Sequence, residues 1–196
     1  MQEARRSQED RRAATRQALL EAARELFAHK GYAATGTPEI VAAAGLTRGA
    51  LYHHFADKLA LFAAVVEAEH AAVARAITAA SDGATAPPDM IDALVVGGDA
   101  FLAAMQDPGR RRIMLIDAPA VLGPEALDAI NQRYGQLTLV EGVQCARDAG
   151  VLADTLPVVP TAELLGALFD RAALAPAPLL PEYRAAMAAI IRGLRR

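Results

Sequence analysis

The spacing of apolar residues along the chain is that of α-helices almost throughout. Between residues 11 and 30 the apolar positions recur every three or four residues, as on one face of a helix, and Gly31 follows as a helix-ending residue. Further helices, separated by proline and glycine, are expected over about 57–80, 89–106, 108–118, 124–149, 161–175 and 181–194. No segment shows the sustained alternation of a half-buried strand. The pattern predicts an all-α fold.

Two short helices are expected directly after the first helix. Thr37 and Pro38 can open one that Gly45 ends, and Thr47 can cap the next. The turn between them is too short for stacked helices and suits crossed ones. One side of the pair can form a small core from Ile40, Val41, Ala44, Leu46, Leu51 and Phe55. The other side has Gly49 in a first helical turn, which lets another molecule approach the backbone closely, as DNA does at a recognition helix.

The stretch from about Thr15 to Val66 resembles the DNA-binding domain of the TetR (tetracycline repressor) family. Residues 22–62, AARELFAHKGYAATGTPEIVAAAGLTRGALYHHFADKLALF, carry the resemblance. The positions at family spacing are Phe27, Gly31, Tyr32, Thr37, Ile40, Ala44, Gly45, Leu46, Thr47, Gly49, Leu51, Tyr52, His54, Phe55, Lys58 and Leu61. The resemblance implies a three-helix, helix-turn-helix domain over 13–60 and a larger helical domain for ligand binding and dimerisation over 61–196.

The resemblance also implies which side chains meet double-stranded DNA. Those in or beside the major groove would be Arg48, Gly49, Tyr52 and His53. Those on phosphates would be Thr37, Thr47, Tyr52, His54 and Lys58. The guanidinium of Arg48 is the best candidate for reading a base, because it can pair with guanine O6 and N7. Each residue also has a plainer interpretation: a solvated surface side chain, a helix cap for the two threonines, and a partly buried ring for His54.

The C-terminal two-thirds of the chain is expected to hold a site for an unidentified small-molecule effector. Residues 99–135 resemble the regulatory domains of many TetR-type proteins. The candidate ligand contacts are Phe101, Met105, Met114, Asp117, Tyr134 and Leu137. Methionine-bearing walls suit a permissive pocket, although core packing explains them equally well. Asp117 lies in an apolar run and needs a partner, either a cationic ligand, an arginine or free backbone N–H groups.

The expected helices 161–175 and 181–194 combine large apolar residues with small ones that permit close approach. In the TetR family the final helices form a four-helix dimer interface. The resemblance therefore implies a homodimer, and a two-fold dimer is expected to bind a pseudo-palindromic operator.

Charge and composition narrow the classes of partner. The net charge is −3, but residues 1–60 carry nine basic and seven acidic groups, a net of +2, so a polyanion should meet this part. Residues 1–12 are polar and are expected to form a flexible arm without the apolar core of a signal peptide. Apolar runs are too short for a membrane span, which predicts a soluble, cytoplasmic protein with no membrane partner.

The sequence offers little for catalysis or metal binding. It has no G-x-S-x-G, H-E-x-x-H or phosphate-binding glycine loop, and Cys145 is its one cysteine. His53 and His54 are adjacent and point in different directions on a helix, so they cannot chelate one ion. We therefore expect no enzyme, cofactor or metal, but a transcriptional repressor released from its operator by a small molecule. The alternative is a constitutive dimeric DNA-binding protein without an inducer.

Overall fold

The computed structural model describes residues 2–83 and 89–196, with side chains at 8–80, 89–134 and 138–196. These residues form ten α-helices and no strand, so the expected all-α fold is confirmed. The first four helices are α1 (Gln2–Lys30), α2 (Thr37–Ala43), α3 (Arg48–His54) and α4 (Lys58–Gly83). The others are α5 (Met90–Ala104), α6 (Pro108–Arg112), α7 (Ala118–Leu122), α8 (Pro124–Asp148), α9 (Val158–Ala173) and α10 (Leu180–Arg192). A π-helical turn, η1 (Ile113–Asp117), joins α6 to α7, and a 3₁₀ turn, η2 (Ala177–Leu179), precedes α10.

Local signals set the ends of α1 to α3. Gly31 and Gly45 both have positive φ, which favours glycine where a helix ends. The hydroxyl of Thr47 caps α3 by accepting a hydrogen bond of 3.2 Å from the N–H of Ala50. Thr37 was expected to cap α2 but is its first residue, with Gly36 at the cap position, so the hydroxyl of Thr37 makes no cap.

Three boundaries differ from the expected ones. The helix α1 begins at Gln2, so the segment expected as a flexible arm is helical where the structure describes it, because no glycine or proline interrupts residues 2–30. The segment 81–88, left between the expected helices 57–80 and 89–106, is helical as far as Gly83, and its remainder, 84–88, lies outside the described residues. Helical structure also continues past Pro119, because proline near the start of α7 needs no N–H donor there.

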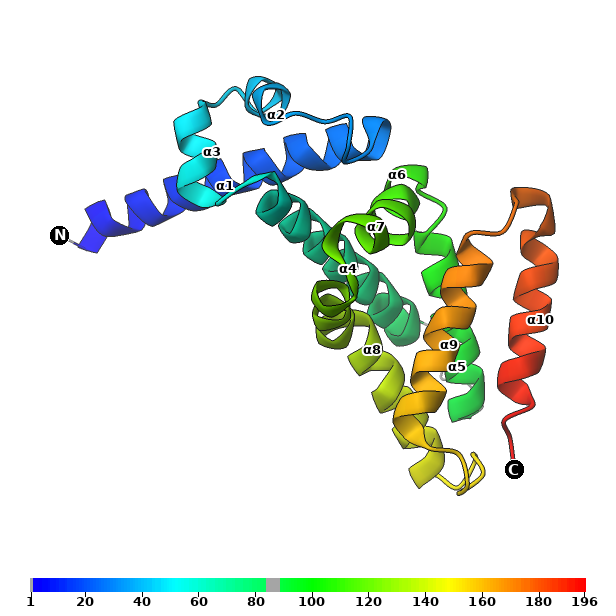
Figure 1. The fold of residues 1–196 in the computed structure, drawn as a ribbon. Helices are drawn as coiled ribbons and strands as arrows, with labels where there is room; N and C mark the ends of the chain where they lie inside the picture. The colour runs from blue at the N-terminus through cyan, green and yellow to red at the C-terminus, as the bar shows by residue number, and fades with distance from the viewer. Residues whose placement is uncertain (1, 84–88) are drawn as a thin grey trace.

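Helix α4 connects the two ends of the molecule. Figure 1 shows it running from beneath α1–α3 into a bundle with α5, α8, α9 and α10. One core surrounds Phe27 and Phe62 and also takes in Ile113 and Ile130, from beyond the first four helices. The second core lies inside the bundle. The first core therefore joins α1–α3 to the rest of the chain, so the helices that could read DNA are not loosely tethered. No described helix is both long enough and apolar enough to cross a membrane.

A buried carboxylate holds three helices together. The side chain of Glu69 on α4 is only 7% exposed and accepts from Arg24 Nε of α1 at 2.6 Å and from Arg110 Nε of α6 at 2.5 Å. Asp107, just before α6, accepts from Arg24 Nη2 at 2.5 Å and caps α6 through the N–H groups of Gly109 and Arg110. Burial works against the charge of Arg24, but its hydrogen bonds, first with Glu69, more than offset this and raise the pKa of Arg24.

Replacing Glu69 tests this network. Glu69→Gln keeps the shape of the side chain but removes the ion-pair partner of Arg110 and leaves Arg24 paired with Asp107 and Glu25. We therefore expect a loss of about 2–3 kcal/mol in the free energy of unfolding. Urea denaturation followed by circular dichroism measures it. The matched control is Glu25→Gln, which removes an exposed partner of the same Arg24 and should cost less than about 1 kcal/mol. Equal losses for the two variants would contradict the assigned role of Glu69.

Candidate functional site

The outer face of α3 presents polar side chains to solvent. Arg48, Tyr52 and His53 are exposed there, and the guanidinium carbon of Arg48 lies 5.8 Å from the centre of the Tyr52 ring. Hydrogen bonds from Arg48 and then from Thr37 lower the pKa of Tyr52. The structure therefore brings Thr37 of α2 together with Arg48 and Tyr52 of α3 as one polar face. Figure 1 shows these two helices beside α1, at the end of the molecule away from α9 and α10.

The first turn of α3 leaves its backbone accessible. A Cβ added to Gly49 would meet only Thr47 Oγ1, at 3.8 Å. Thr47 Oγ1 accepts the capping hydrogen bond, and a hydroxyl that accepts can still donate its own proton. A backbone or phosphate oxygen from another molecule can therefore approach this turn closely.

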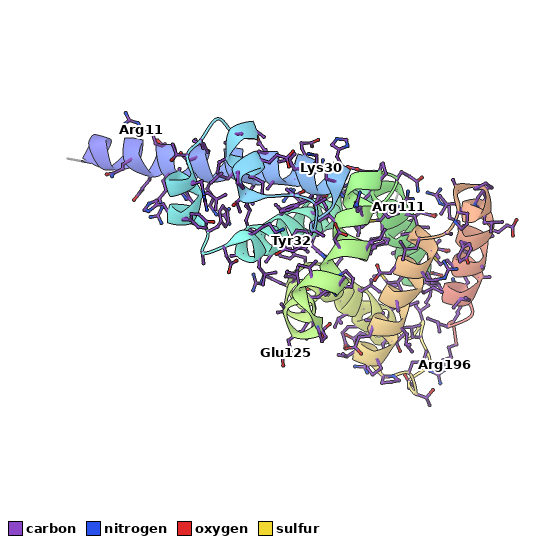
Figure 2. All side chains as sticks on the ribbon, turned by 45° about the horizontal axis from the view of Figure 1, so that its top comes forward. Arg11, Lys30, Tyr32, Arg111, Glu125 and Arg196 are labelled. Carbon is purple, nitrogen blue, oxygen red and sulfur yellow. The ribbon has the colours of Figure 1, made fainter. Side chains whose placement is uncertain are left out.

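Arginines of α1 lie beside the C-terminal end of α3. His54 is half-buried, and burial lowers its pKa, with smaller electrostatic contributions from the neighbouring His53, Arg12 and Arg16. Arg16 also lies over the Phe55 ring, with 5.2 Å between the guanidinium carbon and the ring centre. Figure 2 shows Arg11 on the same end of α1. Sequence reasoning did not include Arg12 and Arg16, although their i, i+4 spacing already placed them on one helix face.

Lys58 lies at the edge of this face and has a structural role. Its Nζ donates to the carbonyl oxygens of Tyr32 and Thr35, both at 3.0 Å, and lies 4.1 Å from the centre of the Tyr32 ring. The start of α4 is thereby fixed to the loop between α1 and α2. An ammonium group has three donors, so one remains for a further acceptor.

Asp117 lies at the junction between α1 and η1 and does not line the cavity described below. Its Oδ2 accepts from the N–H of Tyr32 at 2.9 Å and lies 3.8 Å from Arg112 Nε. Arg112 donates to the carbonyl oxygens of His29 and Lys30, both at 3.1 Å, at the end of α1. Figure 2 shows Lys30 and Tyr32 near α6, which carries the labelled Arg111. A backbone N–H and an arginine therefore satisfy the carboxylate of Asp117, and the structure does not place it among the cavity residues expected to contact a ligand.

A cavity of about 710 Å³ lies between α4, α5, η1, α8 and α9. Phe101, Met114 and Tyr134 line it, as the sequence suggested for ligand contacts. Met105 does not, because it is fully buried in the bundle core. Leu137 was also expected, but its side chain lies outside the described residues. The hydroxyl of Tyr134 is within 3.1 Å of Glu67 Oε1 on α4, which ties α8 to α4 beside the cavity.

Two ionisable groups in the cavity wall were not found from the sequence. Burial lowers the pKa of His70 to about 4, against the opposing charge of Glu69, and its buried Nε2 has no hydrogen-bond partner among the described residues. The side chain of Asp170 is solvent-exposed but lies in the cavity wall, and desolvation by the surrounding helices raises its pKa to about 6. His70 and Asp170 are each a single polar residue on an amphipathic helix. The same pattern is expected for a residue at the protein surface, so the sequence alone does not distinguish the two positions. No group of three His, Cys, Asp or Glu is placed for a metal in the described part of the chain.

The pH dependence of stability tests the environment of Asp170. Since its folded pKa lies above its ordinary 3.8, the ionised carboxylate destabilises the fold above about pH 6, and this cost disappears as the pH falls below the ordinary value. Asp170→Asn should therefore raise Tm near pH 7.5 by about 2–4 °C, after allowance for solvent screening in the cavity, and by little near pH 4. Glu125→Gln, an exposed carboxylate outside the cavity, is the charge control in differential scanning calorimetry. A gain independent of pH would contradict the assignment.

Comparisons with known proteins agree with this arrangement. A family model described as bacterial regulatory proteins, tetR family, matches residues 19–65, and a tetracyclin repressor-like C-terminal domain matches residues 91–196. The curated regulator AcrR of Shigella flexneri is 49% identical over 53 residues, 27% of this chain and 25% of that protein. The curated repressor AcnR of Corynebacterium efficiens is 39% identical over 64 residues, 33% and 34% of the two chains. The chain thus aligns with only a quarter to a third of the length of these relatives.

Solved structures match over nearly the whole chain. A TetR-family transcriptional regulator from Pectobacterium atrosepticum is 34% identical, with a TM-score of 0.77, over 95% of this chain and 96% of that one. A putative TetR-family regulator from Shewanella sp. PV-4 has a TM-score of 0.73 over 92% and 97% of the chains, but its 24% identity supports the fold alone. Because the C-terminal model covers more than half of its length and the N-terminal model covers the helix-turn-helix, the chain belongs to the TetR family of bacterial regulatory proteins.

Proposed function

We propose that this TetR-family transcriptional regulator is a homodimeric repressor, released from a pseudo-palindromic operator when a small molecule occupies the cavity. The observation that carries the proposal is a physical connection: the same two elements, α4 and η1, contribute to the cavity wall and hold the helix-turn-helix. The constitutive alternative leaves the cavity without a role.

The exposed face of α3 supports specific DNA binding. Arg48 reads a base edge, assisted by Tyr52 and His53, and Gly49 allows the close approach that reading requires. Thr37, Thr47, His54 and Lys58 position the phosphate backbone, and Arg12 and Arg16 add to this group. Contacts to phosphate set orientation and salt dependence, whereas contacts to bases set sequence preference.

The C-terminal helices support dimerisation. Leu164 on α9 is 73% exposed and Ile190 on α10 is 50% exposed, high values for large apolar side chains. Val159, Leu174 and Leu179 are exposed on or next to the same elements. Burying such side chains against a second copy is favourable, and a two-fold axis there would pair two copies of α3 on one DNA duplex.

Two connections support coupling between the cavity and DNA. Helix α4 contributes Val73 and Ile77 to the cavity wall, and its first residue, Lys58, holds the loop after α1. The turn η1 contributes Met114 to the wall and Asp117 to the N–H of Tyr32. A ligand that fits only one position of these elements shifts the helix-turn-helix, and couplings of this kind are on the order of 1–3 kcal/mol.

The DNA proposal is tested by selecting binding sites from random duplexes and footprinting the best one. We expect a pseudo-palindrome with two related half-sites. Arg48→Ala should cost about 1–3 kcal/mol on that site and relax the preference at one position in each half. The comparison variant Arg12→Ala should weaken all sequences alike and reduce the salt slope by about one. Binding without sequence preference, or identical behaviour of the two variants, would contradict the proposal.

The dimer proposal is tested by placing a charge on the exposed apolar face. Leu164→Asp should shift the molecular mass in analytical ultracentrifugation toward the monomer, because a carboxylate cannot be buried unpaired in an apolar interface. Operator affinity should fall with it, since one helix-turn-helix then binds alone. Leu59→Asp on α4 changes an equally apolar exposed residue away from α9 and α10 and should leave the mass unchanged. A dimeric Leu164→Asp protein would show that the interface lies elsewhere.

A further inference from the structure

The charges in the cavity wall have one sign. Asp128 of α8 and Glu163 and Asp170 of α9 line the cavity, and no Lys or Arg is among its described lining residues. His70 also lines it, but burial lowers its pKa to about 4, so the imidazole is neutral at physiological pH. A molecule entering the cavity therefore meets carboxylates, and no basic side chain that is charged at this pH, among the described lining residues.

Asp170 is placed to contact a bound molecule together with aromatic rings. Its neighbour in the chain, Phe169, lies in the same wall, and the ring centres of Phe169 and Phe101 are 6.1 Å apart. The close packing of α5 on α9 holds the Phe169 ring: a Cβ on Gly98 would lie only 2.6 Å from its Cε1. Tyr134 adds a third ring from α8. Aromatic faces attract cations, and this attraction grows when water is displaced.

The physical cost of each kind of ligand differs. An anion would be repelled by the carboxylates of the wall, and the fields in a partly desolvated cavity are stronger than in water. A neutral apolar molecule would displace water from the Asp170 carboxylate without replacing the lost hydrogen bonds. Removing water from a charged group in this way is unfavourable. A metal ion lacks a cluster of ligands in the described residues. An organic cation can form an ion pair with the carboxylate and a cation–π contact with the aromatic rings.

We propose that the cavity takes an organic cation, a molecule with an apolar, preferably aromatic, body whose positive charge lies beside Asp170 and within reach of the rings of Phe101 and Phe169. An organic cation would then be the effector of the proposed repressor, and this regulatory role rests on the proposed function. The binding preference itself is a property of the cavity and can be measured without DNA.

Two ions of nearly the same shape and opposite charge provide the test, tetraphenylphosphonium and tetraphenylborate. Both are bulky aromatic ions of the size that cavities of several hundred Å³ accommodate. Isothermal titration calorimetry on the full-length protein should show tetraphenylphosphonium binding at least about tenfold more tightly than tetraphenylborate, because one charge-assisted contact in a desolvated site is worth about that factor. Equal affinities, tighter binding of the anion, or no binding of either ion would overturn the proposal.

Variants locate the charge that is responsible. Asp170→Asn should reduce the preference for the cation severalfold, while Glu125→Gln, which removes an exposed carboxylate outside the cavity, should leave it unchanged. Equal effects of the two variants would mean that net charge, and not Asp170, sets the preference, and this would overturn the assignment. Circular dichroism and Tm establish that both variants are folded.

A gel-shift assay on the selected operator separates this proposal from the proposed function. Release of DNA by tetraphenylphosphonium, lost in Asp170→Asn, supports both. Cation binding that depends on Asp170 but leaves the DNA complex intact supports the charge assignment and contradicts effector release. If the dimer binds the operator but binds the two ions with equal affinity, the DNA-binding part of the proposed function is supported and the cation assignment is overturned.

Discussion

The position of the helix-turn-helix depends on one buried carboxylate. Glu69 of α4 is held by an arginine of α1 and an arginine of α6, and removing a charged group from water is tolerable only while such partners stay in place. Separating α1 from α4, or α6 from either, would leave a charge buried and unpaired. These ion pairs tie the three helices together, and in the proposed mechanism a displacement of α4 at the cavity would be passed to α1.

The parts that could be predicted from the sequence are those specified by neighbouring residues. Gly31 and Gly45 end helices because of their own backbone conformation, and Thr47 caps the helix that follows it. Leu51 and Phe55, four residues apart, are both buried as their spacing indicated. The start of α1 is not evident from the sequence because residues 2–10 carry no apolar stripe, although the absence of glycine and proline there is compatible with a helix.

The parts that could not be predicted are those that depend on residues far apart in the chain. Asp117 was correctly expected to need a partner, but the N–H that satisfies it belongs to Tyr32, 85 residues away. Asp170 and His70 look like ordinary polar positions on their own helices, and only the packing of α8 against both α4 and α9 brings them into one cavity wall. Met105 and Met114 are equivalent by pattern and both are buried in the bundle core, yet only Met114 also lines the cavity.

The π-helical turn η1 has a geometrical consequence for the coupling between the two sites. In an α-helix, residues three apart project within about 60° of each other, so Met114 and Asp117 would share a face. A π-helical turn spreads the same pair to an angle on the order of 120°, because each residue advances less around the axis. Because of this wider angle, one short segment can place Met114 in the cavity wall while the carboxylate of Asp117 accepts from the N–H of Tyr32, in the loop after α1. Deleting a single residue from this turn would restore the α-helical angle, and the two ends of the connection would no longer face their separate partners.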